Sequence, residues 1–162
     1  MMPPTPGEMQ ERLNASHQRL LVAVDGLDAQ VLENDAAVGV WTARDVTGNV
    51  IDWNWELLWA AQAALGGTTV AHHPIVDGEA YNQSKAAQRK DASWAETRAE
   101  LDRSFADSLT LLATLTPEQL ETDAQAPWGG DLKVGNLFAD IAHHADEHSA
   151  QLEAWRASGQ PQ

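Results

Sequence analysis

The sequence has 162 residues without a cysteine, and its 24 acidic and 10 basic residues give a formal net charge of −14. This charge opposes binding to DNA, RNA or an anionic membrane, and the lack of cysteine excludes disulfides, thiolate zinc sites and a cysteine nucleophile. The length suits one domain, expected over residues 1–162, and the absence of a leader pattern or a spanning apolar run makes a cytoplasmic protein the expectation.

Four stretches of the sequence repeat apolar residues with the period of a helix. Each such stripe buries one face of a helix, so the pattern predicts four helices around a shared core. Start signals precede the first three stretches, where a hydroxyl residue is followed three positions later by a carboxylate. Asp131 is the predicted cap of the fourth. The stripes run from Met9 to Val31, Val46 to Ala64, Trp94 to Leu115 and Val134 to Trp155, and the cap pairs are Thr5 with Glu8, Thr42 with Asp45 and Ser93 with Glu96.

A long connection separates the second and third predicted helices. Gly66 and Gly67 end the second stripe, and residues 68–91 show no sustained period. Neighbouring helices of a bundle are normally joined by a few residues, so we expect this connection to cross over or to cover a site. Pro117 opens a short extra turn, residues 126–130 form a turn-rich loop, and no strand alternation is evident. The sequence therefore predicts an all-α fold, a four-helix bundle with a long connection between helices two and three.

The last predicted helix contains the segment HHADEH, residues 143–148. His144 and His148 are four residues apart, so they project one turn apart from the same face, which is also the apolar stripe. Two neutral imidazoles in this arrangement can hold one zinc, nickel, copper or iron ion. They can equally be histidines at the edge of the core that bond to their neighbours. Firm metal binding needs a third ligand from another helix.

Four segments together resemble the DinB-like superfamily, which includes the metal-binding domain of mycothiol-dependent maleylpyruvate isomerases. The first is WTARDV at residues 41–46, with Trp53 further along, and the last is HHADEHSAQLEAW at residues 143–155. Between them, AYN at residues 80–82 and LTPEQL at residues 115–120 are similar to family segments. The resemblance extends roughly from the first helix to Trp155.

The resemblance implies a four-helix bundle with a long connection, commonly a homodimer, in which three histidines hold a divalent metal. The ligands carried over from the last helix are His144 and His148. The third is expected eight positions after Trp41, where this chain has Asn49. The implied activity is that of a hydrolase, or of a transferase or isomerase that uses a low-molecular-weight thiol.

Asn49 leaves three possibilities open. Its amide oxygen can serve as the third ligand, although it is a harder and weaker donor than imidazole. Another side chain can take its place, or the metal site can be lost and leave a polar pocket. The predicted ligand set is His144, His148 and Asn49, with zinc or nickel as the expected ion. The candidates for replacing Asn49 are His17, Asp52, His72 and His73.

Several other residues allow two interpretations each. Trp55 and Trp59 share one face of the second helix, which indicates either a dimer interface or a contact with the long connection. Tyr81 and Asn82 can close over a ligand or cap the surface. Asp140, one turn before His144, can orient the imidazole ring or face solvent.

Two functions follow from these patterns. The first is a metal-dependent enzyme in which the ion keeps open positions for water or substrate. The second is a non-catalytic, stress-related bundle that binds a small ligand or dimerises and has lost the metal. Neither pattern identifies a catalytic residue or a substrate.

Overall fold

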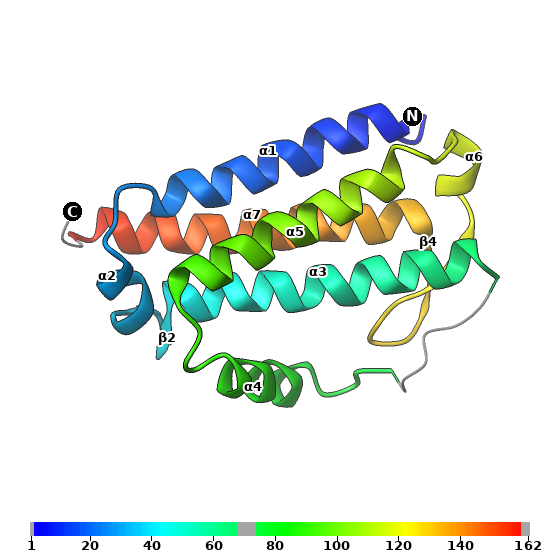
Figure 1. The fold of residues 1–162 in the computed structure, drawn as a ribbon. Helices are drawn as coiled ribbons and strands as arrows, with labels where there is room; N and C mark the ends of the chain where they lie inside the picture. Colours follow the sequence, from blue (N-terminus) through cyan, green and yellow to red (C-terminus); the bar gives the residue numbers. More distant parts are fainter. Residues whose placement is uncertain (1, 68–73, 160–162) are drawn as a thin grey trace.

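The four longest described helices make up about half of the protein and lie side by side (Figure 1). The computed structural model describes residues 2–67 and 74–159. Helix α7 packs against α1 and α3, and α5 packs against the same two helices. The predicted four-helix bundle is thus confirmed. The helices are α1 (Pro6–Val24), α3 (Ala43–Leu65), α5 (Trp94–Leu112) and α7 (Val134–Ala157).

The predicted apolar stripes form the core, and hydroxyl and carboxylate side chains cap the helices as expected. Both bonds of the capping box are present at Thr5, Thr42 and Ser93. The prediction that Asp131 caps the last helix is wrong. Lys133 occupies the N-cap position, and its backbone N–H donates to Asn136 Oδ1 over 2.9 Å. Fully buried core side chains include Leu13, Val50, Leu101, Phe105, Leu137, Ile141 and Leu152.

The short connections of the bundle contain elements that the sequence pattern did not predict. The first stripe is divided, because α1 ends at Val24, Gly26 adopts a φ of 77°, and α2 (Ala29–Asn34) follows. Two antiparallel hairpins pair β1 (Ala36–Val38) with β2 (Trp41–Thr42), and β3 (Asp123–Gln125) with β4 (Asp131–Lys133). Strands of two or three residues are too short to show alternation. The predicted extra turn at Pro117 is present as α6 (Pro117–Leu120).

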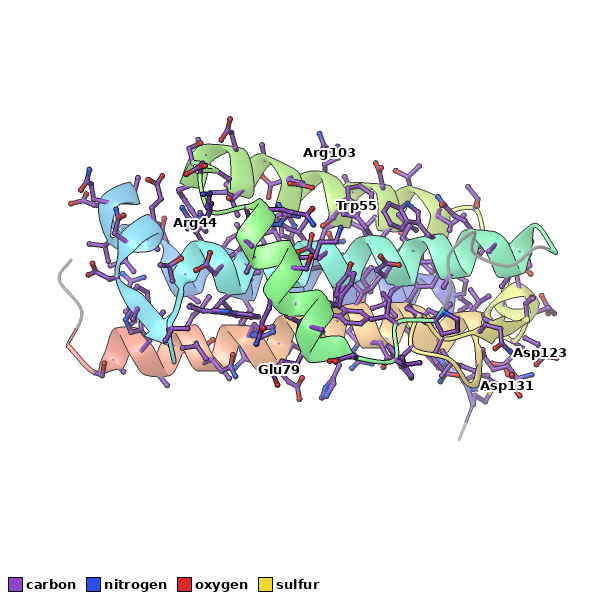
Figure 2. The ribbon with its side chains drawn as sticks, turned by 90° about the horizontal axis from the view of Figure 1, so that it is seen from below. Arg44, Trp55, Glu79, Arg103, Asp123 and Asp131 are labelled. Atoms are coloured by element: carbon purple, nitrogen blue, oxygen red, sulfur yellow. The ribbon has the colours of Figure 1, made fainter. Side chains whose placement is uncertain are left out.

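The long connection carries the chain back along the bundle. The colours of Figure 1 show that α3 and α5 run in the same direction, so the chain must return between them. The expectation of a crossover is therefore confirmed. Although the sequence shows no helical period there, the connection contains α4 (Gly78–Gln88), which crosses α3 obliquely (Figure 2). None of the α4 residues is buried, which explains why the sequence shows no apolar stripe.

Polar side chains hold the C-terminal end of α4 against the bundle. Arg89, the residue that caps α4, bonds Asp52 of α3 over 2.5 and 3.3 Å and Glu100 of α5 over 2.8 and 3.4 Å. The stem of Arg89 lies on Gly48, where an added Cβ would stand only 2.7 Å from Arg89 Cδ. Gly48 therefore makes room on α3 for the residue that fastens α4.

Candidate metal centre

His144 and His148 lie on the side of α7 that faces α3. Their Nε2 atoms are 3.0 Å apart, and the rings meet edge to face with centroids 4.6 Å apart. Both side chains are partly buried at the border of the core. The two imidazoles thus present one nitrogen each to the same point, as their spacing on the helix predicts.

Asn49 of α3 completes this group. Its Oδ1 lies 3.0 Å from His148 Nε2, and the residue is 6% exposed. Two donors at about 2.1 Å from one ion lie about 3.0 Å apart when they are at right angles and about 3.4 Å apart at the tetrahedral angle, so both observed separations are close to those around a shared ion. Among residues 2–67 and 74–159, no group of three His, Cys, Asp or Glu side chains could hold a metal ion, and the third group beside these two histidines is an amide.

Burial keeps both imidazoles neutral. It is the main cause that lowers the pKa of His144 to about 3, and the charges of His148 and His143 act in the same direction. Burial also lowers the pKa of His148, although Gln151 and Glu147 act in the opposite direction. Neutral imidazole is the form that ligates a metal, so neither ring has to lose a proton near pH 7.

A second set of hydrogen bonds surrounds the three donors. Asn49 Nδ2 donates to Asn82 Oδ1 over 2.8 Å, and Trp53 Nε1 donates to the same oxygen over 2.8 Å. On the other side, His148 Nδ1 lies 2.7 Å from Oε1 of the exposed Gln151. The connection between α3 and α5 therefore contacts the candidate centre directly, through Asn82 of α4.

The hydrogen-bond partners determine which atoms of His148 carry lone pairs. As the Gln151 amide stands, His148 Nδ1 donates to it, so the Nε2 lone pair and Asn49 Oδ1 face each other without a hydrogen between them. A cation would satisfy both atoms. A rotation of the exposed Gln151 amide reverses the tautomer, and Nε2 then donates to Asn49 Oδ1 in the ion-free protein.

His144 has a further unsatisfied atom. Its Nδ1 is buried and has no hydrogen-bond partner within the described part of the chain. Asp140 therefore does not orient this ring through a hydrogen bond. Burial raises the pKa of Asp140, against the opposing charges of His143 and Arg12.

A pocket of about 300 Å³ opens beside His144. Trp53, Leu57 and the exposed Trp128 supply its apolar walls, and the two indole rings meet at 60° with centroids 6.2 Å apart. His143 and Glu147, 3.3 Å apart, belong to its lining together with Asp140. This volume is at the small end of known ligand pockets.

The other candidates for the third ligand have different partners. His17 Nε2 bonds Asp102 Oδ1 over 2.7 Å, and its ring stacks on Phe105. Asp52 is paired with Arg89. His72 and His73 lie outside the described residues. Asn49 is thus the predicted ligand that the structure places beside the two histidines.

Three residues around the candidate centre were not predicted to serve it. Trp53 was named only in the family resemblance, Trp128 lies in the turn-rich loop, and Gln151 was only part of the family segment. Asn82 was interpreted as a ligand-closing or surface residue, whereas it bonds Asn49. Its neighbour Tyr81 donates its hydroxyl hydrogen to Glu56 Oε1 over 3.0 Å. Since α4 lacks an apolar stripe, no sequence signal places its side chains relative to α3.

Comparison with solved structures shows the same fold in proteins of low sequence identity. The Sibling Lethal Factor Precursor DfsB aligns with a TM-score of 0.81 at 18% identity, over 98% of this chain and 99% of that one. The colibactin self-resistance protein ClbS, solved in complex with a dsDNA, aligns with a TM-score of 0.79 at 13% identity, over 96% of this chain and 98% of that one. YfiT from Bacillus subtilis aligns with a TM-score of 0.78 at 22% identity, over 96% of this chain and 89% of that one. It is described as a probable metal-dependent hydrolase with an unusual four-helix bundle topology.

Sequence comparison places the chain in a family. No curated protein matches it. Within the described residues, no helix is both long enough and apolar enough to cross a membrane. The model of the DinB superfamily matches residues 12–152, which include α3, α7 as far as Leu152, and all three candidate ligands. The chain therefore belongs to the DinB superfamily.

Proposed function

We propose that this protein binds one divalent metal ion, zinc or nickel, through His144, His148 and Asn49, and that it is a metal-dependent hydrolase or a thiol-dependent transferase or isomerase. The observation that carries the proposal is that His148 Nε2 lies 3.0 Å from His144 Nε2 and 3.0 Å from Asn49 Oδ1. The description of YfiT as a probable metal-dependent hydrolase supports the same class.

The chemistry of the donors fits such an ion. Imidazole nitrogen suits zinc and nickel, while an amide oxygen is a harder donor that weakens the site without preventing it. His148 Nε2 and Asn49 Oδ1 face each other, an ion between them would accept a lone pair from each, and both imidazoles are neutral at pH 7. Three protein ligands leave further positions open, and an ion there would supply Lewis-acid chemistry.

The protein groups around the pocket would bind and orient the substrate. Trp53, Leu57 and Trp128 form its apolar walls, and His144 joins this pocket to the ligand group. Asp140, Glu147 and His143 supply polar groups beside it. A substrate with a compact apolar part fits this lining, and its reacting group would lie against His144.

Metal analysis of protein purified without a histidine tag tests the proposal. We expect about one zinc or nickel ion per chain after incubation with the metal and removal of the excess, and loss of this ion in His148→Ala. His143→Ala is the matched control, because His143 lies in the same helix but outside the ligand group. Absence of bound metal in the unaltered chain, or full binding by His148→Ala, contradicts the proposed site.

The second hypothesis, a non-catalytic bundle, is favoured by one observation, the amide in place of a third imidazole. In that case the pocket binds its ligand without turnover. Isothermal titration with zinc or nickel distinguishes the two hypotheses, because the metal-dependent enzyme must bind the ion and the non-catalytic bundle should not. The non-catalytic bundle also predicts that His148→Ala leaves the stability of the protein unchanged.

We further propose a cytoplasmic homodimer that uses Trp55 and Trp59. These rings stack with centroids 6.3 Å apart, and Trp59 is 45% exposed. Both also line a pocket of about 480 Å³ with residues of α4, so the contact with the long connection remains the competing interpretation. Trp59→Glu should shift the protein from dimer to monomer in sedimentation velocity, and an unchanged profile would exclude Trp59 from the interface.

A further inference from the structure

The amide of Asn49 can face His148 in either of two ways, and only one of them presents a metal ligand. With Oδ1 toward His148, the side chain offers a lone pair to an ion. With Nδ2 toward His148, it offers two hydrogens, which an ion would repel. Something must therefore fix the direction of this amide if Asn49 is to serve as a ligand.

The hydrogen bonds around Asn82 determine that direction. The indole Nε1–H of Trp53 can only donate, so the atom of Asn82 that lies 2.8 Å from it must be the oxygen. Asn49 also lies 2.8 Å from this oxygen, so the atom that Asn49 presents there must be its Nδ2. The remaining atom, Oδ1, is then the one that faces His148 Nε2.

From this chain of donors and acceptors we infer that Asn82 is a positioning residue, which with Trp53 holds the Asn49 oxygen toward His148. The long connection thus contributes to the candidate centre from outside the four long helices. As far as it concerns an ion, this inference rests on the proposed function. The orientation of the amide does not depend on an ion and can be tested alone.

Substitution of Trp53 and Asn82 separates orientation from packing. Trp53→Phe keeps a ring but removes the N–H, so the Asn82 amide is free to turn and Asn49 can turn with it. Asn82→Leu removes the acceptor. Both should weaken zinc binding about 10- to 100-fold in isothermal titration, the usual effect of losing an outer hydrogen-bond partner of a ligand. Asn82→Asp keeps an acceptor for both donors, so it should retain the affinity of the unaltered chain or exceed it.

The variant Asn49→Asp supplies the decisive control, because both of its terminal side-chain atoms are oxygens and its direction no longer matters. In this background Trp53→Phe should not weaken zinc binding. The inference is wrong if Trp53→Phe weakens binding equally with and without the Asn49→Asp substitution, or if Asn82→Asp binds as weakly as Asn82→Leu. In either case the residues only support the fold.

A measurement without metal distinguishes this inference from the proposed function. The indole hydrogen of Trp53 and one amide hydrogen of Asn49 each lie about 1.9 Å from the same oxygen, hence within about 4 Å of each other. We expect a nuclear Overhauser effect between them in the ion-free protein. Its absence overturns the orientation. Its presence in a chain that binds no zinc supports the orientation and refutes the metal site instead.

Discussion

At the scale of single residues, the nature of the candidate centre depends on one side chain. His144 and His148 supply two neutral nitrogens, and Asn49 supplies an oxygen at the position where the family resemblance implies a third imidazole. Imidazole is the better donor for zinc, so the amide should give a weaker site that exchanges its ion more readily. The affinity of this chain for zinc should therefore be limited by Asn49.

Asn49→His tests this limit directly. We expect zinc to bind roughly tenfold more tightly or better, because the third donor becomes an imidazole nitrogen. Isothermal titration or competition with a chromogenic chelator gives the affinity. Asn14→His, on the exposed side of α1, is the control for an additional surface histidine and should leave it unchanged. An unaltered affinity in Asn49→His would show that residue 49 does not face the ion.

At the scale of elements, α4 is held by a polar anchor in place of an apolar face. Burial raises the pKa of Asp52 against the opposing effect of Arg89. Burial acts the same way on Glu100, but there the bond and charge of Arg89, together with Trp55 and Arg103, outweigh it and lower the pKa. Both carboxylates hold the Arg89 guanidinium, so its stem cannot move away from Gly48 easily.

Gly48→Ala should therefore destabilise the protein, although alanine normally favours a helix by about 1 kcal/mol over glycine. The new Cβ would overlap the clamped Arg89 stem, and we expect a loss of about 1–3 kcal/mol in the free energy of unfolding, measured in urea. Gly7→Ala, where the nearest atom would be 3.9 Å away, should not destabilise α1. If the two substitutions change the free energy of unfolding equally, the Arg89 side chain can move away from residue 48 without destabilising the protein.

The contrast between helices with a buried apolar face and α4, which has none, explains how much of the structure the sequence could predict. The four long helices bury apolar stripes, so periodicity and capping pairs indicate them, and the four-residue spacing brings His144 and His148 together. Helix α4 buries none of its residues, and the hairpins are too short for a pattern. The Asn49–Asn82 bond joins residues 33 positions apart, which no local spacing reveals. Asn49 itself was found through the family resemblance.

At the scale of the whole molecule, the charge sets which large partners are compatible with the surface. Twenty-four acidic residues against ten basic ones give the chain a field that repels phosphate backbones. ClbS shares the fold and was solved with a dsDNA, but at 13% identity the likeness extends to the fold alone. The surface charge of this chain therefore argues against the same partner.

Fluorescence anisotropy with a labelled DNA duplex checks this expectation. We expect no binding between about 20 and about 200 mM NaCl, since a net repulsion becomes only weaker as salt screens it. Binding at low salt that falls steeply as salt rises would reveal a basic contact surface and contradict the prediction. Vesicles of anionic lipid, tested in the same way by cosedimentation, should likewise remain free of protein.

The anchoring of α4 also bears on how quickly an ion could enter or leave. A helix without a buried side chain is held to the bundle mainly by its polar bonds, so its detachment costs less than global unfolding. Detachment would carry Asn82 away from α3, and the Asn49 amide would then rotate while the core stayed intact. Loading and release would thus follow a local opening, faster than unfolding by orders of magnitude, and strengthening the α4 anchor would slow both.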